Sequence, residues 1–179
     1  MTTLDTFIQE EDYKMFNSRR ILWKLRGWDI KLTTTVEQGT YRDYSDAITY
    51  EIGVALREFV RNGFKAIYGV GAPMYEIDDL EAQERAKSIP ARLSIELSQT
   101  ENNYVIAVSD NGRGIMLQDR NRLFEEGFST CGTTGIGLPA ARENVCQFGG
   151  RIYFNTHCWG DHLEDENITG TTFYLALPK

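Results

Sequence analysis

Apolar residues that alternate with polar ones, or that form short uninterrupted runs, predict five strands along this chain. Residues 28–36 and 91–98 alternate, and residues 104–109 are almost continuously apolar. Two later stretches complete the set, at residues 151–155 and 171–177. The turn-forming tripeptide Glu-Asn-Asn separates the second strand from the third, so these two strands are expected to form a hairpin.

Apolar residues at helical spacing predict two helices. The longer one runs to about residue 68 and begins after Ser45, which stands where an N-cap is wanted. The second is predicted at residues 138–148, where Gly149 and Gly150 end it. Helices packed against a set of strands predict an α+β fold, a two-layer sandwich with a mixed, mostly antiparallel sheet covered by helices on one face.

The remaining segments carry weaker patterns. A helix within residues 9–26 and a short one within residues 74–90 fit the apolar spacing, and residues 39–44 fit a turn-like connection. The chain is expected to consist of one domain, residues 28–179, preceded by a helical N-terminal extension, residues 1–27.

Composition narrows the functional classes. The chain has 179 residues and a net charge of −7, which argues against nucleic acid or an anionic membrane as the main partner, because both need a basic face. The acidic N-terminus does not resemble a secretory signal, and no apolar run is long enough to span a bilayer. Three widely spaced cysteines form no disulfide framework, so a reducing, cytoplasmic location is expected.

Three polar residues, Glu58, Asn62 and Lys65, share one stripe of the long predicted helix because they lie four and three residues apart. Beside them runs the stripe expected to face the core: Ile52, Leu56, Phe59, Gly63 and Ile67. An Asn oxygen suits Mg²⁺, a Glu could activate a water, and a Lys could meet a phosphate. On the helix alone, a solvated polar face is the more common explanation of such a triplet.

A second candidate follows the apolar strand directly, at residues 109–115. Gly112 and Gly114 permit a close approach of a ligand to the backbone. Asp110 is a pure acceptor, which suits an exocyclic amine such as that of adenine. A simple Asp-Asn-Gly turn explains this segment equally well.

A third candidate, residues 132–138, carries three glycines and runs straight into the second predicted helix. Backbone N–H groups at such a helix start form an anion site. The segment lacks the Lys-Ser/Thr of a P-loop, and no strand directly precedes it as a dinucleotide-binding fingerprint requires. The alternative is a flexible loop with a helix cap.

Taken together and in this order, the motifs resemble the ATP-binding domain shared by histidine kinases, dehydrogenase kinases, type II topoisomerases, ninety-kilodalton heat-shock chaperones and mismatch-repair ATPases. Residues 58–66 match the N box and residues 109–115 the G1 box. Residues 123–130 match the F box and the start of the lid, residues 134–138 the G2 box, and residues 170–173 the final Gly-Thr motif. The closest patterns are the catalytic domains of histidine kinases and dehydrogenase kinases.

The resemblance implies a left-handed βαβ sandwich that holds ATP and Mg²⁺ beneath a mobile lid. It implies that Asn62 holds the metal and that Asp110 binds the adenine amine, whereas Phe124 and Phe128 either anchor the lid or pack into the core. The implied ATP-binding residues are Asn62, Lys65, Ala66, Asp110, Gly112, Gly114, Ser129, Thr130, Gly132, Gly135, Ile136, Gly137, Leu138 and Thr171.

The chain departs from this pattern in four ways. Glu58 stands where many histidine kinases carry Asn, which favours a catalytic general base acting on water or on a substrate hydroxyl. Thr133 replaces a glycine of the G2 box, and Cys131 stands where a Lys often follows in the lid. The only histidines, His157 and His162, come after the G2 box. We therefore expect no hairpin with a phosphoacceptor His within these residues, and whether the chain is one piece of a larger kinase is left open.

Three functions fit these departures. The first is a kinase of signal transduction, as in two-component systems, that transfers phosphate from ATP to a separate partner protein. The second is an ATPase that uses Glu58 as its base, and the third is an ATP-dependent interaction module with little turnover. A homodimer through residues 1–27 is left open. A metal site in residues 157–162 is weighed against a polar surface loop, which is the default.

Overall fold

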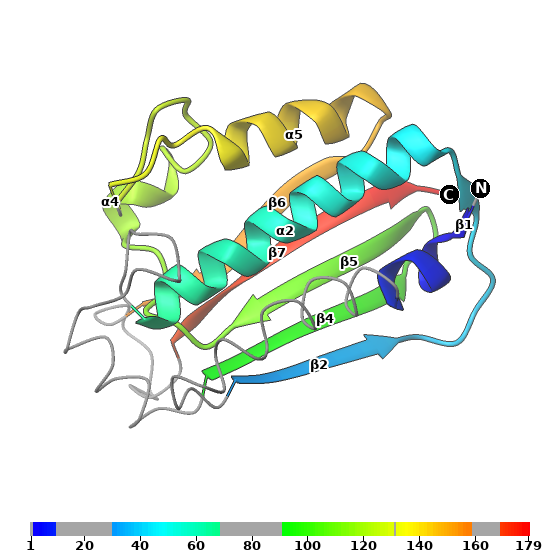
Figure 1. Ribbon diagram of the computed structural model, residues 1–179, viewed down its shortest axis with the longest axis horizontal. Helices are drawn as coiled ribbons and strands as arrows, with labels where there is room; N and C mark the ends of the chain where they lie inside the picture. The colour runs from blue at the N-terminus through cyan, green and yellow to red at the C-terminus, as the bar shows by residue number, and fades with distance from the viewer. Residues whose placement is uncertain (1, 10–29, 69–90, 131, 159–168) are drawn as a thin grey trace.

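The computed structural model describes residues 2–9, 30–68, 91–130, 132–158 and 169–179. In these residues five strands form one sheet in the order β2-β4-β5-β7-β6, with β2 parallel to β4 and the other neighbours antiparallel. Their bounds are β2 Ile30–Val36, β4 Ala91–Gln99, β5 Asn103–Asp110, β6 Arg151–His157 and β7 Gly170–Pro178. The predicted mixed, mostly antiparallel sheet is confirmed (Figure 1).

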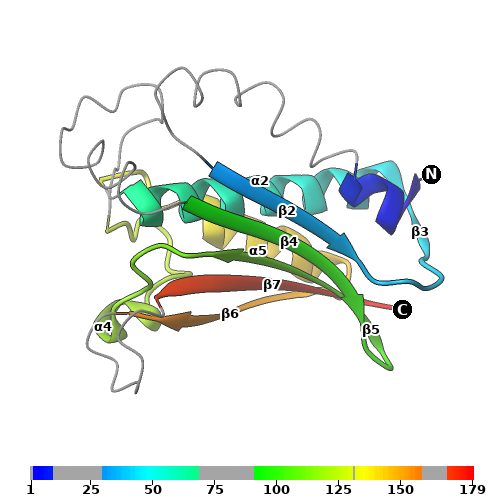
Figure 2. The same cartoon turned by 90° about the horizontal axis from the view of Figure 1, so that it is seen from below.

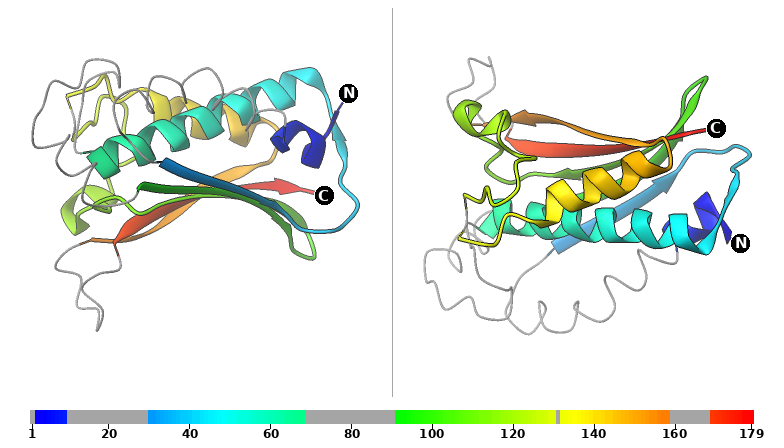
Figure 3. Two further views of the ribbon diagram at one scale, coloured as in Figure 1. Left: turned by 60° about the horizontal axis from the view of Figure 1, so that its bottom comes forward. Right: turned by 90° about the horizontal axis from the view of Figure 1, so that it is seen from above.

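Two helices, α2 (Asp46–Tyr68) and α5 (Gly137–Gln147), cover the same face of the sheet (Figures 2 and 3). The short helix α4 (Leu117–Arg120) lies at the end of the sheet where α2 ends (Figure 1). The opposite face of the sheet carries no described helix. The predicted two-layer α+β sandwich is therefore confirmed.

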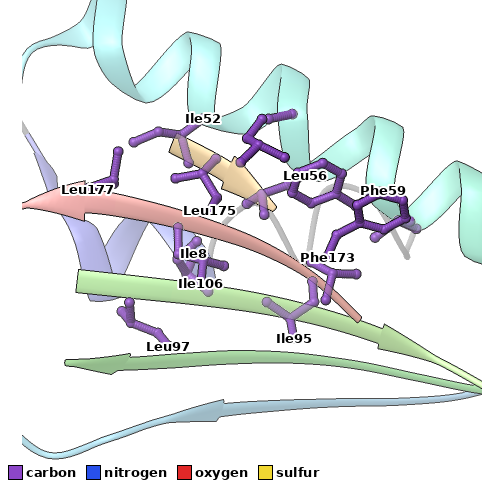
Figure 4. Packing of buried hydrophobic residues seen from close by; sticks show 14 of the residues in the cluster. Ile8, Ile52, Leu56, Phe59, Ile95, Leu97, Ile106, Phe173, Leu175 and Leu177 are labelled. Carbon is purple, nitrogen blue, oxygen red and sulfur yellow. The ribbon is translucent and has the colours of Figure 1, made fainter. Parts of the chain in front are cut away.

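The long helix buries one stripe against the sheet, as its apolar spacing predicts. Ile52, Leu56 and Phe59 are at most 1% exposed, and Figure 4 shows their side chains pointing onto β7 and β5. The Phe59 ring stacks on Phe173 of β7 with centroids 4.9 Å apart. Because one face of α2 is fixed in this way, the neighbouring polar stripe is directed toward the start of α5 rather than the sheet.

The N-terminal residues belong to the same core. Strand β1 (Thr2–Thr3) pairs with β3 (Asp43–Tyr44), and residues 4–9 are helical. Leu4 and Ile8 are almost fully buried within the core cluster, and Ile8 is visible in Figure 4. Residues 4–9 are thus packed against the domain as a helix, and the predicted division of the chain at residue 27 stays a prediction.

Element boundaries agree with the sequence to within two residues. Helix α2 begins after Ser45, whose Oγ accepts the Ile48 N–H at 3.5 Å. Strand β6 continues to His157, two residues past the prediction, because Thr156 is buried and its hydroxyl contacts that of Thr171 at 3.1 Å. The helices predicted within 9–26 and 74–90 lie outside the described residues, apart from residue 9. None of the helices described is long and apolar enough to cross a membrane.

Candidate functional site

A cleft opens between α2, the loop after β5 and the segment that leads into α5. Most of the predicted ligand-binding side chains line it: Glu58, Asn62, Lys65, Ala66, Asp110, Gly114, Ser129, Thr130, Gly135, Gly137, Leu138 and Thr171. These residues come from segments that are far apart in the sequence. Three motifs, each weak alone, therefore lie around one cavity.

Asp110 ends β5 at one end of the cleft, in a closely packed setting. Its Oδ1 accepts the Gly112 N–H at 2.8 Å. Burial raises the pKa of Asp110 from its ordinary value of 3.8 to about 7, although hydrogen bonds from the backbone N–H groups of Gly112 and Thr171 act in the opposite direction. The carboxylate is thus a fixed acceptor whose ionised form is costly without a donor in the cleft.

Two glycines let this end of the cleft close up. A Cβ at Gly63 of α2 would lie 3.1 Å from the Cβ of Asp110. A Cβ at Gly112 would lie 2.6 Å from the backbone carbonyl carbon of Ala66. The Arg113 N–H also donates to the Ala66 carbonyl at 3.1 Å. Gly112 does not line the cleft, so its place in the G1 box is explained here by packing against α2.

Glu58 lies at the opposite end, about one and a half helical turns along α2 from Gly63, which contacts Asp110. Its Oε1 forms an ion pair with an Nη of Arg61 at 3.0 Å, and the Glu58 side chain is 20% exposed. Its carboxylate also contacts Gly137, the first residue of α5, because a Cβ there would overlap it. The predicted base therefore lies against the glycine-rich helix start, where backbone N–H groups attract anions.

The lid segment forms a short loop, and most of its described residues line one side of the cleft. The Gly127 N–H donates to the Gly135 carbonyl at 3.2 Å, which joins the two ends of the loop. Gly135 has a φ of +65° and packs against the Phe128 backbone, so only glycine fits there without strain. Within the loop, the Ser129 and Thr133 hydroxyls are 2.9 Å apart.

Two predicted residues of this segment do not line the cleft. Ile136 is 50% exposed, and a Cβ at Gly132 would meet nothing within 4 Å. The resemblance assigned them to ATP by motif position, but neither lines the cavity in this structure. Cys131 lies outside the described residues.

The two lid phenylalanines have different environments. Phe128 lines the cleft, and the Arg122 guanidinium lies 4.4 Å from its ring centroid. Phe124 instead packs beside Phe154, with ring centroids 6.1 Å apart, next to the core. Core packing therefore describes Phe124, whereas Phe128 belongs to the cleft wall.

Sequence reasoning missed several residues of the cleft wall: Arg61, Arg113, Ile115, Leu123, Thr133, Thr134, Pro139 and Phe173. Arg61 and Arg113 matter most because they add positive charge to a cleft that holds two carboxylates. Both stand inside recognised motifs at positions to which no role was assigned. The spacing of Arg61 three residues after Glu58 is the signal that could have found it.

The residues present fit a magnesium ion. Asn62 and Glu58 offer hard oxygen atoms one turn apart on α2, and both line the cleft. Mg²⁺ commonly takes one or two protein oxygens and completes its shell with phosphates and water. In the part of the chain that the structure describes, no group of three His, Cys, Asp or Glu residues is gathered for an all-protein metal site.

The His157–Cys158 pair lies at the end of β6, beside the loop that contains Gly114. An Arg120 Nη donates to the Cys158 Sγ at 3.6 Å. His162 lies outside the described residues, so the metal alternative for this loop stays a prediction.

The sequence of this chain is similar to a family of ATPases and to parts of sensor kinases. A family model described as "Histidine kinase-, DNA gyrase B-, and HSP90-like ATPase" matches residues 50–179. The sensor protein CitS of Halalkalibacterium halodurans is 33% identical over 49% of this chain and 15% of its own length. The sensor histidine kinase DpiB of Escherichia coli is 36% identical over 46% of this chain and 14% of its own length. The matched stretch is thus a small part of each relative.

Solved structures share the fold at low sequence identity. The mycobacterial sensor histidine kinase MprB superposes with a TM-score of 0.64 at 19% identity, over 99% of this chain and 96% of that one. Histidine kinase ThkA, solved in complex with the response regulator protein TrrA, superposes with a TM-score of 0.64 at 16% identity, over 99% of this chain and 41% of that one. The arrangement of strands and helices around the cleft is therefore shared with histidine kinases.

Proposed function

Because this chain belongs to the family of histidine kinase-, DNA gyrase B- and HSP90-like ATPases, we propose that it binds ATP with Mg²⁺ and transfers the terminal phosphate to a separate protein. The observation that carries this proposal is the single cleft that joins Asp110, Asn62, Lys65 and Glu58 to the start of α5.

In this proposal the two ends of the cleft bind different parts of ATP, the adenine at Asp110 and the phosphates at the start of α5. Asp110 accepts a hydrogen bond from the adenine amine, and that donor stabilises its ionised form. At the other end, backbone N–H groups from Gly135 to Leu138 bind phosphate oxygens, because a helix N-terminus favours anions. Lys65, which is 8% exposed, adds a fixed cation at the cleft wall.

Asn62 would hold Mg²⁺ through its side-chain oxygen, and the Glu58 carboxylate one turn away stays available as the base. When bound, the metal supplies charge neutralisation for the phosphates. The chain's own groups then orient the terminal phosphate toward the open side of the cleft, where a partner can reach it. Phe128 and the lid loop exclude water from the bound nucleotide.

In the transfer, the acceptor atom of the partner forms a bond to the γ-phosphorus. The bond from that phosphorus to the bridging β,γ-oxygen breaks, and ADP leaves. Glu58 accepts the proton of a hydroxyl acceptor. A histidine acceptor attacks through its unprotonated ring nitrogen and does not need this base, so Glu58 favours a hydroxyl acceptor.

ATP hydrolysis is a second candidate, and the position of Glu58 favours it. The side chain is partly open to solvent and lies beside the phosphate end of the cleft. A water in the acceptor position would lose its proton to the same carboxylate. Hydrolysis and transfer therefore differ only in which acceptor reaches the cleft.

The test is incubation of the protein with γ-labelled ATP, Mg²⁺ and an extract of its own cells. We expect label on a second protein, and acid and base treatment then separate phosphohistidine from phosphoserine or phosphothreonine. Release of free phosphate with no labelled protein would favour hydrolysis. Tight nucleotide binding with neither product would leave the interaction module as the function.

A further inference from the structure

Arg61 lines the cleft, and the proposed phosphate transfer gives it no role. It lies three residues after Glu58 on α2, and its side chain is 48% exposed. Its Nη contacts the Glu58 Oε1 at 3.0 Å, and both residues line the same cleft. The guanidinium is therefore free to change partners without any rearrangement of the core.

The ion pair between Arg61 and Glu58 lies at the phosphate end of the cleft, opposite Asp110. Glu58 contacts Gly137 at the start of α5, whereas Gly63 of the same helix contacts Asp110. At a rise of about 1.5 Å per residue, these two contacts are separated by roughly 7.5 Å along α2. Arg61 thus belongs to the end opposite Asp110, beside the helix N-terminus that attracts phosphate.

Charge and geometry favour an exchange of partners at this end. An ion pair three residues apart on a helix and half open to water contributes little to stability, so it is easily broken. A guanidinium presents a planar fork that matches phosphate oxygens at two points. A terminal phosphate carries more negative charge than the Glu58 carboxylate and would compete with it successfully.

We propose that Arg61 distinguishes a nucleoside triphosphate from a diphosphate. In the nucleotide-free protein it pairs with Glu58, and in the triphosphate complex its fork binds the terminal phosphate. The exchange also releases the Glu58 carboxylate to act as a base only when a phosphate is present to be transferred. This inference rests on the proposed function, because it requires that adenine nucleotides bind in this cleft.

The test is calorimetric titration of the full chain with Mg²⁺ and either ADP or a non-hydrolysable ATP analogue. For Arg61→Gln we expect the affinity for the analogue to fall about tenfold, equal to about 1.4 kcal/mol, and the affinity for ADP to change less than twofold. Arg61→Lys should recover part of the loss, because it restores charge without the fork. Arg57→Gln is the matched control, since Arg57 is exposed on the same helix and does not line the cleft.

The outcomes separate this inference from the proposed function. Equal losses for both nucleotides, or no loss for either, would overturn the role of Arg61 and leave nucleotide binding intact. Failure of the unmodified protein to bind either nucleotide would overturn the proposed function itself. Thermal unfolding of Arg61→Gln beside the unmodified protein verifies that the folded state is retained, which the half-exposed position of Arg61 leads us to expect.

Discussion

The two ends of the cleft are built differently. At the Asp110 end, β5 pairs with β7, and the backbone of the loop after β5 contacts the backbone of α2 at Gly112. At the Glu58 end, a partly exposed ion pair and the described residues of the lid loop, 128–130 and 133–135, form the wall. One end is part of the folded core, and the other consists of side chains and a loop at its surface.

This difference suggests a division of labour in the proposed function: the Asp110 end recognises the adenine, and the Glu58 end carries out phosphate transfer. An acceptor held in place by backbone N–H groups, as Asp110 is, discriminates strongly among the donors presented to it. A base and a lid that move without disturbing the core can admit a nucleotide, change partners and release product. We therefore expect changes at the Asp110 end to alter binding and stability together, and changes at the Glu58 end to alter turnover.

The largest expected effect is on the chemical step. Glu58→Gln should lower phosphate transfer or release by about 100- to 10,000-fold, because the amide cannot accept the proton. Nucleotide affinity should change by only a few-fold. Single-turnover assays with labelled ATP measure the first quantity and titration measures the second. Glu96→Gln, on an exposed position of β4, is the matched control, and unchanged turnover in Glu58→Gln would contradict the assignment.

The next largest effect should appear in binding. Asp110→Asn removes the charged acceptor and should weaken adenine nucleotide affinity by about 30- to 100-fold, in line with a charge-assisted hydrogen bond. Titration with ADP measures it, and Asp119→Asn in α4, outside the cleft, is the control. Equal ADP affinity of Asp110→Asn and the unmodified protein would show that the Asp110 end does not recognise the adenine.

A pair of glycine substitutions compares the two ends directly. Gly112→Ala forces a methyl group into the α2 backbone and should lower the free energy of unfolding by about 1–3 kcal/mol. Gly137→Ala meets only the flexible Glu58 side chain, so it should change stability by less than about 1 kcal/mol while lowering turnover. Denaturant unfolding and phosphate-release assays distinguish them, and the reverse ranking would refute the comparison.

The raised pKa of Asp110 predicts that the stability of the protein depends on pH through this one carboxyl group. Because burial raises that pKa from 3.8 to about 7, the folded nucleotide-free protein holds this proton more tightly than the unfolded chain. Its contribution to stability is fully present below pH 4 and is lost as the pH rises through about 7. Denaturant unfolding of the unmodified protein should show this loss relative to Asp110→Asn. Parallel curves for the two proteins from pH 5 to pH 8 would contradict it.

The smallest effect should come from within the lid. Ser129→Ala removes the hydroxyl that contacts Thr133 and receives its backbone N–H at 3.0 Å. A partly exposed hydrogen bond of this kind contributes about 0.5–1.5 kcal/mol to local order. We expect faster hydrogen exchange in residues 127–135, no measurable change in global unfolding, and at most about a threefold change in affinity. Slower exchange in the variant would show that this contact does not hold the lid.

Much of the site could be predicted because its motifs are local. The spacing of Glu58, Asn62 and Lys65 places them on one helix stripe, and in the structure all three line the cleft. Their roles stay predictions. The position of Asp110 in the site could be predicted because it stands at the end of an apolar strand and begins a glycine-containing loop. Gly132 and Ile136 do not lie in the cleft wall, and their motif could not show this, because membership of a motif does not tell which way a loop residue faces.

What the sequence determined by itself is the set of helices and strands, the apolar stripe of α2 and the order of the motifs, because these depend on periodicity within short segments. Only the tertiary structure decided that Leu4 and Ile8 enter the core and that the Glu58 carboxylate rests against Gly137, 79 positions later in the chain. Such contacts depend on how whole elements pack, and no local spacing records them.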